Sequence, residues 1–233
     1  MNHPNLMPRL TAMPINRRRC LGLLAGLMPA TALPGCALVN TESPYWATVG
    51  AIGGVTHSSP VSRAQADALP YASILASFDD SPIAFMVLGD ISQAGVAYYY
   101  SQGRQVLGLR GPFVVHTVGV PGDLSHTSWE GAEPPDLRQL VGKEWQRRID
   151  IQSAALYQIP VRGRFFADGR ETITILERSY DLEVIREEVE MRGEKPYTNR
   201  YWIDPVTGFC WKSHQHIHGR AAGLNIEVTK PAG

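Results

Sequence analysis

The sequence predicts an all-β fold, in which about eleven antiparallel strands form a meander that closes, or nearly closes, into a barrel behind a short helical segment. Three observations support this prediction. Beyond Pro82, short runs rich in β-branched and aromatic residues are separated by turn residues about every eight to twelve positions. Several of these runs alternate apolar and polar residues, and turn-forming sequences lie between them.

The segment before Pro82 is expected to hold a tether and short helices. Residues 36–59 are rich in Ser, Thr, Gly and Pro, which is typical of a connection to a folded body. Ser59-Pro60 resembles a helix N-cap followed by proline at the first helical position, so a helix is predicted over 61–68, ending near Pro70. Residues 71–78 are predicted to form a second helical piece. A single domain is expected over 60–233.

The candidate strands follow in a regular series. Asp168-Gly169 suits a type I′ hairpin, and the segments 193–196 and 204–208 suit longer turns. Short hairpins between neighbouring strands predict an antiparallel meander. The predicted strands are 83–88, 95–101, 105–110, 113–118, 145–153, 156–166, 171–179, 182–191, 197–203, 209–218 and 224–229.

Alternation within the strands predicts that the sheet curls. Trp145, Ile149 and Ile151 share one face of their strand, and polar residues occupy the other face. Residues 224–229 alternate in the same way. A sheet of about eleven strands with one apolar face must curl to bury that face and to hide its edges.

The first 35 residues indicate an export signal. They contain four arginines and no acidic residue. Their apolar stretch at 20–33 is shorter than the roughly 20 residues of a membrane-spanning helix, and is typical of a signal-peptide core. Leu33-Pro34-Gly35-Cys36 resembles the bacterial lipobox, so we expect cleavage before Cys36 and lipid on its thiol. The alternative is a free cysteine in an ordinary signal peptide.

The residues around the cleavage site also predict a location. Ala37 is not the aspartate that resembles an inner-membrane retention signal, so we expect attachment to the outer membrane, with the body on the periplasmic side. The acyl chains of a lipidated cysteine provide the membrane anchor. Residues 16–21 resemble a twin-arginine export signal, and a basic cluster in another type of export signal explains them equally well.

Charge and cysteine content limit the partners. Removing four arginines with the signal leaves 18 basic against 22 acidic residues, a formal charge of −4. This balance argues against a nucleic-acid partner. With Cys36 lipidated, Cys210 has no disulfide partner, so apolar burial and backbone hydrogen bonds must hold the fold. We expect Cys210 to be a small buried residue rather than a reactive thiol. No cofactor is predicted.

Three histidines form the sharpest local pattern. On a strand, His214, His216 and His218 would point the same way, with side chains about 7 Å apart. Three imidazoles on one face are a ligand set for Zn²⁺ or Cu²⁺. The competing interpretation is that they simply face water, because no nearby Cys/His pair has metal-ligand spacing.

Aromatic residues suggest carbohydrate contact. The chain has five tryptophans and nine tyrosines, and sugars bind by stacking their apolar faces on such rings. In Tyr98-Tyr99-Tyr100, alternation should expose at least one ring. Tyr99, Trp129 and Trp202 are therefore candidate carbohydrate contacts, and burial in the core is the alternative for each.

No catalytic motif emerges from the sequence. It lacks G-x-S-x-G, H-E-x-x-H, Walker A and C-x-x-C patterns. The neighbouring carboxylates Glu187-Glu188 and Asp79-Asp80 would point apart on strands and could not act on one bond. We expect a protein that is not an enzyme. Two alternatives stay open: a polysaccharide-modifying hydrolase built from carboxylates distant in sequence, and a metal-binding envelope protein.

Several segments together resemble the YjbF/GfcB family of lipoproteins. The hallmark lies at 199–215, and 70–72, 111–119 with Asp123-Leu124, 180–184 and 226–231 resemble the family in the same order. The resemblance implies a twelve-stranded meander bent into a deformed barrel, an outer-membrane lipoprotein, and a role in capsule or exopolysaccharide secretion without catalytic residues. Polysaccharide and other export-complex proteins are the implied partners, besides the membrane. The sequence departs from the family at Cys210, where an apolar β-branched residue is expected, and in the histidine-rich stretch 213–218.

Overall fold

The structure is a computed structural model that describes residues 59–232, apart from residues 80, 121 and 132. The described residues form one twelve-stranded sheet with the short helices α2 (Arg63–Ala68) and α3 (Leu137–Leu140) and a 3-10 turn at Gln152–Ala154. The all-β prediction is confirmed. The strands are β1 (Ser73–Phe78), β2 (Ala84–Ile91), β3 (Ala97–Ser101), β4 (Val106–Arg110), β5 (Phe113–Val118), β6 (His126–Trp129), β7 (Glu144–Ile151), β8 (Leu156–Ile175), β9 (Arg178–Met191), β10 (Tyr197–Ile203), β11 (Cys210–Gln215) and β12 (Leu224–Lys230).

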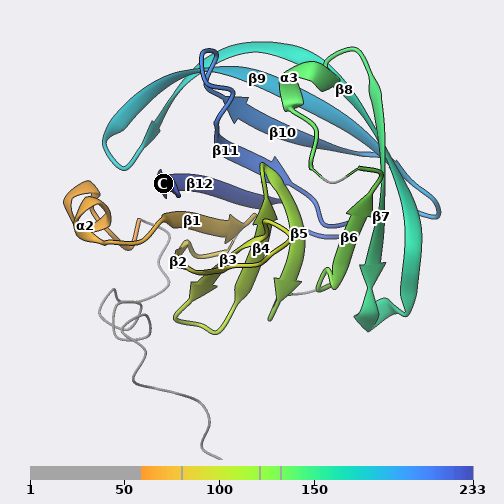
Figure 1. The fold of residues 1–233 in the computed structure, drawn as a ribbon, viewed down its shortest axis with the longest axis horizontal. Helices are drawn as coiled ribbons and strands as arrows, with labels where there is room; N and C mark the ends of the chain where they lie inside the picture. The colour runs from red at the N-terminus through yellow and green to blue at the C-terminus, as the bar shows by residue number, and fades with distance from the viewer. Residues whose placement is uncertain (1–58, 80, 121, 132, 233) are drawn as a thin grey trace, which may run out of the picture. The chain divides into compact units, whose positions relative to one another are not determined.

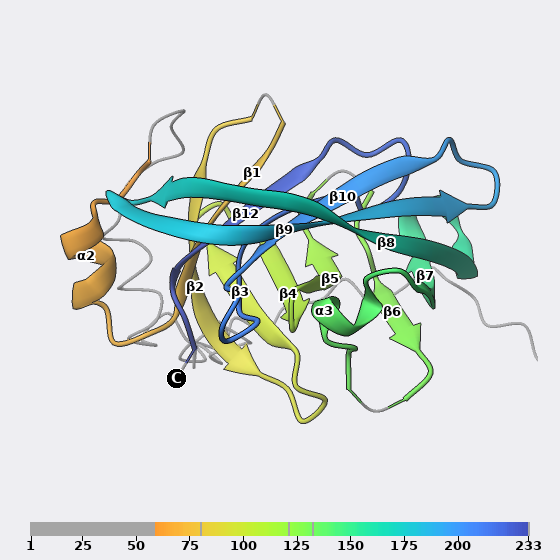
Figure 2. The same cartoon turned by 90° about the horizontal axis from the view of Figure 1, so that it is seen from above.

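The order of the strands makes the sheet nearly closed. It runs β5-β4-β3-β2-β1-β12-β11-β10-β9-β8-β7-β6, and every pair in it is antiparallel. The first and last strands therefore pair with each other, and the two free edges belong to β5 and β6, which are consecutive in the chain. These two edges lie side by side as the sheet curls (Figure 1 and Figure 2).

The gap between β5 and β6 is closed mainly by side chains, and we call it the side-chain seam. At one end, Thr117 N donates to Leu124 O at 2.9 Å. Towards the other end the two edges carry no ladder, and the rings of Phe113 and Trp145 lie 4.7 Å apart, with Trp129 5.5 Å from Trp145. Leu137 and Leu140 of α3 join the same apolar cluster, so α3 covers this part of the interior.

The first strand corrects a predicted helix. Residues 71–78 were expected to be helical, but β1 pairs with β2 and β12 on its two sides. The consecutive residues Ile74 and Leu75 point to opposite faces, and both are buried, the first in the interior and the second under α2. Because both faces of this strand are covered, the sequence lacks the alternation that indicates a strand.

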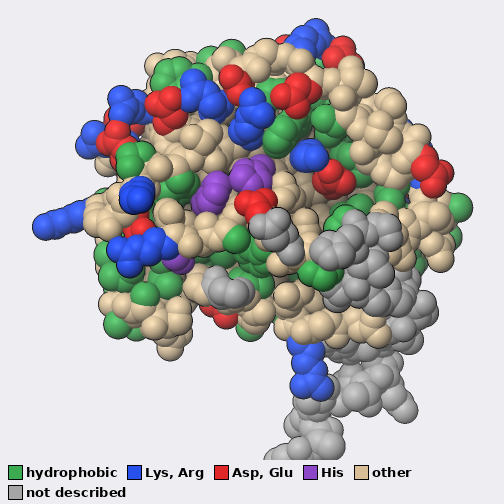
Figure 3. Space-filling view, turned by 180° about the vertical axis from the view of Figure 1, so that it is seen from behind, with side chains coloured by type: hydrophobic (Ala, Val, Ile, Leu, Met, Phe, Trp, Pro, Cys, Tyr) green, Lys and Arg blue, Asp and Glu red, His purple; other side chains and the backbone are tan. Residues whose placement is uncertain are grey.

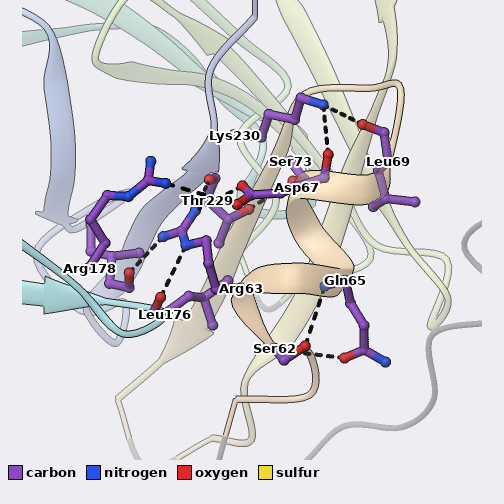
Figure 4. Close-up of polar contacts among 11 residues, drawn as sticks. Ser62, Arg63, Gln65, Asp67, Leu69, Ser73, Leu176, Arg178, Thr229 and Lys230 are labelled. Atoms are coloured by element: carbon purple, nitrogen blue, oxygen red, sulfur yellow. Dashed lines mark hydrogen bonds and ion pairs between the residues drawn. The ribbon is translucent and has the colours of Figure 1, made fainter.

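Helix α2 forms close to its predicted place, with Ser62 rather than Ser59 as its N-cap. Ser62 and Gln65 form a reciprocal capping box. Arg63 then donates to three backbone carbonyls, those of Leu176 (3.0 Å), Thr229 (2.6 Å) and Ile175 (2.6 Å). Figure 4 shows this contact, which fastens α2 to the tip of the β8–β9 hairpin and to the end of β12.

The longest hairpin is formed by β8 and β9 and differs from the prediction at its turn. Asp168-Gly169 does not make the hairpin but lies in a bulge inside β8, where the register shifts between Ala167 and Arg170. The turn falls instead at Leu176 and Glu177, both with positive φ. The predicted strand 156–166 is thus part of β8, and the predicted strand 171–179 covers the end of β8, the turn and the first two residues of β9. Strand β6 was missed because its sequence, HTSW, is short and largely polar.

Candidate functional site

The interior of the barrel contains a buried ion pair. Glu187 of β9 is fully buried and accepts hydrogen bonds from Arg147 of β7 at 2.5 Å, from Asn199 at 2.9 Å and from the Tyr201 hydroxyl at 2.9 Å. Gly163 of β8 makes room for it, since a Cβ there would lie 2.1 Å from Glu187 Oε1. Three donors around one carboxylate are what a buried charge needs to be tolerated.

The charges in this network are mutually stabilised. Burial acts to lower the pKa of Arg147, but the Glu187 carboxylate raises it overall. Burial, followed by the repulsion of Glu187, raises the pKa of Tyr201 well above its ordinary value, so the phenol stays protonated and donates. Arg147 and Tyr201 therefore both keep their protons near neutral pH and remain donors to the Glu187 carboxylate.

Gln215 extends the network to the free edge at β5. Its Nε2 donates to Pro112 O at 2.8 Å, and its Oε1 accepts from Val114 N at 3.2 Å and from the Tyr201 hydroxyl at 3.5 Å. Strands β11 and β5 are far apart in the sheet order, so Gln215 spans the interior. The cavity beside the network measures about 20 Å³, so this part of the interior is filled by side chains.

A larger cavity opens at one end of the barrel. It measures about 290 Å³ and is lined by residues of β3, β4, β11 and β12, with the turns next to them and the C-terminal residues Pro231 and Ala232. Tyr99, Phe209 and Trp211 supply its aromatic walls, and the rings of Phe209 and Trp211 lie 4.9 Å apart. We call this set of three residues the aromatic mouth. Cavities at the mouths of barrels are common ligand sites.

The candidate carbohydrate residues lie in three separate places. Tyr99 is 6% exposed and lines the aromatic mouth. Trp129 lies at the side-chain seam beneath Arg110, whose guanidinium is 5.1 Å from the ring centroid. Trp202 is 7% exposed, and its Nε1 donates to Glu171 at 2.8 Å. Tyr99 and Trp202 thus present little free ring surface, because neighbouring side chains cover them.

Sequence reasoning missed Phe209 and Trp211 as members of an aromatic mouth. Phe209 is 37% exposed, and Trp211 contacts both Phe209 and Tyr180, whose ring centroid lies 4.4 Å away. A register shift between Trp202 and Ile203 leaves Trp211 as the extra residue of a bulge, so simple alternation does not give its direction. The aromatic character of 209–211 was the available signal.

The structure brings two of the three predicted histidines together. The rings of His214 and His216 lie 5.0 Å apart and are perpendicular. Strand β11 ends at Gln215, so the alternation that was expected to align all three histidines stops, and His218 lies instead against Gly122. Asp79, at the end of β1, takes its place: the ligand atoms of Asp79, His214 and His216 all lie within 4.8 Å of one another.

Asp79 is held in position by three groups. Its carboxylate accepts from Asn225 Nδ2 at 3.1 Å and from Gly223 N at 3.0 Å, and lies 3.3 Å from His214 Nε2. Partial burial acts to raise the pKa of Asp79, but the Asn225 hydrogen bond and the attraction of His214 lower it overall. Burial, reinforced by His214, lowers the pKa of His216. A carboxylate and a neutral imidazole are the forms that bind metal.

This cluster reaches the surface. Histidine side chains gather near the middle of one face of the molecule, with an acidic side chain beside them (Figure 3). Sequence reasoning could not have found Asp79, because 135 positions separate it from His214 and only the pairing of β1, β12 and β11 brings them together.

The two cysteine predictions have different outcomes. Cys210 is half-buried, its thiol donates to Lys212 O at 3.1 Å, and burial raises its pKa to about 12, so it is not a thiolate near neutral pH. Cys36, together with the predicted signal peptide and tether up to residue 58, lies outside the described residues.

Comparisons with known proteins give consistent matches. The family model described as "Group 4 capsule polysaccharide lipoprotein gfcB, YjbF" matches residues 47–228. The uncharacterized lipoprotein GfcB of Escherichia coli K12 is 28% identical over 183 residues, covering 74% of this chain and 82% of that protein. The crystal structure of the hypothetical lipoprotein YmcC from Escherichia coli K12 is similar, with a TM-score of 0.64 and 26% identity, over 74% of this chain and 90% of the other.

Proposed function

The chain belongs to the family of group 4 capsule polysaccharide lipoproteins, and we propose that it is held at the outer membrane by lipid on Cys36. From the periplasmic side it assists assembly or secretion of a capsule or exopolysaccharide. It does so without being an enzyme. The match of the family model over residues 47–228 carries this proposal, because it includes part or all of every strand of the sheet. Both relatives described above are lipoproteins by name.

We assign polysaccharide contact to the aromatic mouth. Phe209 and Trp211 offer flat apolar surfaces of the kind on which sugar rings stack, in a cavity of about 290 Å³ that the buried Tyr99 also lines. Phe209 is 37% exposed, so part of this surface is open to a ligand.

The placement of acidic groups supports a role without catalysis. A hydrolase needs two carboxyl groups that converge on one bond. Among the described residues, Glu187 is the buried acidic residue, and three donors inside the barrel occupy its oxygens. The described residues that line the cavity at the aromatic mouth include neither Asp nor Glu. An increase in reducing ends when the purified protein is incubated with the cognate polysaccharide would instead favour the hydrolase alternative.

The location is tested by changing the anchor. Separation of the membranes of the producing cell by density should place the wild-type protein in the outer-membrane fraction, and Cys36→Ala should release it into the soluble fraction. Added protease should digest the wild-type body only after the outer membrane is opened. Recovery of the wild-type protein with the inner membrane would contradict the proposed location.

The role of the aromatic mouth is tested by a double substitution. Cells that carry Phe209→Ala and Trp211→Ala should produce less surface polysaccharide than wild-type cells, at equal protein level and with unchanged membrane location. Val206→Ala is the matched control, because Val206 is 85% exposed, on the same β10–β11 connection, and not part of the cavity. Normal surface polysaccharide in the double variant would remove the mouth from the proposal while leaving the anchor intact.

A further inference from the structure

The cluster at Asp79, His214 and His216 has the composition of a transition-metal site. Two imidazoles and one carboxylate are a ligand set that zinc and its neighbours accept, with water in the fourth position. The three residues come from the end of β1 and from the end of β11 and the residue after it, on either side of β12. We propose that Asp79, His214 and His216 bind a divalent transition-metal ion, for which Zn²⁺ is the probe.

The distances are compatible with this assignment. Zinc bonds of about 2.0–2.2 Å in a tetrahedral arrangement place ligand atoms about 3.4 Å apart. His214 Nε2 already lies 3.3 Å from Asp79 Oδ1. The third ligand atom lies within 4.8 Å of the other two, so a small side-chain adjustment of His216 completes the triangle.

His216 has an unused nitrogen at this place. Its Nδ1 is buried and finds no hydrogen-bond partner among the described residues. Buried polar atoms in native proteins are almost always paired, so an imidazole with an unpaired nitrogen, 5.0 Å from the ring of His214, suggests that a bound group completes the site. The backbone N–H of His216 donates to Asn199 Oδ1 at 2.9 Å, which links its position to the interior network.

The groups around Asp79 resemble the outer shell of a metal site. Metal-binding carboxylates are commonly fixed by additional hydrogen bonds, and Asn225 and Gly223 supply two to Asp79. Gly223 also gives the site its space, because a Cβ there would lie 2.0 Å from His214 Nε2 and 2.6 Å from Asp79 Oδ2. This site is separate from the aromatic mouth, and the proposal does not depend on the proposed function.

Titration calorimetry tests the site. The full-length chain, purified in detergent without a histidine tag and freed of metal with a chelator, should bind one equivalent of Zn²⁺ with saturable heat. Asp79→Asn and His214→Gln should each weaken binding by at least about tenfold. Asp79 is the cleaner position, because its side chain is 47% exposed and its substitution does not disturb the core. His218→Gln is the matched control and should bind as wild type.

Cobalt gives a second readout. Co²⁺ bound by these ligands should produce the visible absorption of a tetrahedral or five-coordinate site in wild type and in His218→Gln, and that absorption should be lost in His214→Gln. Absence of saturable Zn²⁺ binding to the wild-type chain would overturn the proposal. Equal affinity in wild type, Asp79→Asn and His214→Gln would overturn it as well, because the metal would then lie elsewhere.

Discussion

The barrel is closed at two places, and the two closures are built differently. β1 and β12 are joined by a backbone ladder from Ser73↔Lys230 to Phe78↔Leu224, and the hydroxyls of Ser73 and Thr229 lie 2.8 Å apart within it. The side-chain seam between β5 and β6 relies on aromatic packing, on α3 and on the bridge made by Gln215. Ladder bonds depend little on residue type, so single substitutions should damage the seam more than the ladder.

The largest effect is expected at the ion pair behind the seam. Arg147→Met leaves Glu187 buried without its cation and should lower the free energy of unfolding by about 3–5 kcal/mol in urea denaturation. The double variant Arg147→Met with Glu187→Leu should recover most of this loss. Arg164→Met is the control, since Arg164 and Glu190 are about half exposed, and it should cost about 0–1 kcal/mol. Equal losses in Arg147→Met and Arg164→Met would refute the role of burial.

The next effect separates the two closures directly. Gln215→Leu removes the bridge to β5 and leaves Pro112 O and Val114 N without their partner. This substitution should lower the free energy of unfolding by about 1–3 kcal/mol. Hydrogen exchange should accelerate at the Val114 amide more than at the amides of β1. Uniform acceleration at both closures would show that Gln215 supports the whole barrel rather than the seam.

A smaller effect is expected at the loop that joins β5 to β6. Asp123 accepts hydrogen bonds from Gly119 N and Val120 N, both at 3.0 Å, and from Thr117 Oγ1 at 3.2 Å. Asp123→Ala should lower the free energy of unfolding by about 1 kcal/mol, measured by thermal or urea denaturation. Asp181→Ala, at a 65% exposed carboxylate on β9, should change stability little. A loss at Asp181 as large as that at Asp123 would argue that charge, rather than the loop geometry, matters.

The last effect is absent near neutral pH and reports on how well water is excluded from the apolar cluster at the seam, which contains Phe113, Leu137 and Tyr201. Cys210 packs against that cluster, and burial raises its pKa from 9.0 to about 12. Between these values the folded chain keeps a proton that the unfolded chain releases, so stability falls as pH rises above about 9. The variant Cys210→Val has no thiol at this position and therefore lacks this pH-dependent loss of stability. The difference in unfolding free energy between the two proteins should be constant below pH 9 and move in favour of the variant above it. A constant difference up to pH 10 would contradict the raised pKa.

The sequence predicted most of the sheet but not its exceptions. Strands with one covered face, such as β7 and β12, alternate and were found. β1 was mistaken for a helix because both its faces are buried, and β6 was missed because it is four residues long. Asp168-Gly169 has the chemistry of a tight turn, but β8 continues through it as a bulge, because pairing with β9 resumes on both sides.

The candidate sites were predicted only where their residues are close in sequence. The pair His214 and His216 follows from spacing, whereas Asp79 and the partners of Glu187 depend on which strands become neighbours. The expectation that Glu187 and Glu188 point apart is confirmed, since the Glu187 side chain is fully buried and that of Glu188 is 46% exposed. Alternation in the sequence predicts which face of a strand a side chain occupies. Its contacts on that face depend on which strands the closed sheet brings together.

The strand order also has a consequence for connectivity. Each strand pairs with its neighbours in sequence except at β1–β12, where Ile74 meets Val228, and at the seam, where consecutive strands do not form a ladder. The order is therefore cyclic: β1 and β12, which are far apart in the sequence, are joined by a ladder, whereas β5 and β6, which are consecutive, are not. A circular permutant that joined β12 to β1 and opened the chain between β5 and β6 would keep every ladder while making all of them local. Such a chain would have lower contact order and should fold faster than the natural one.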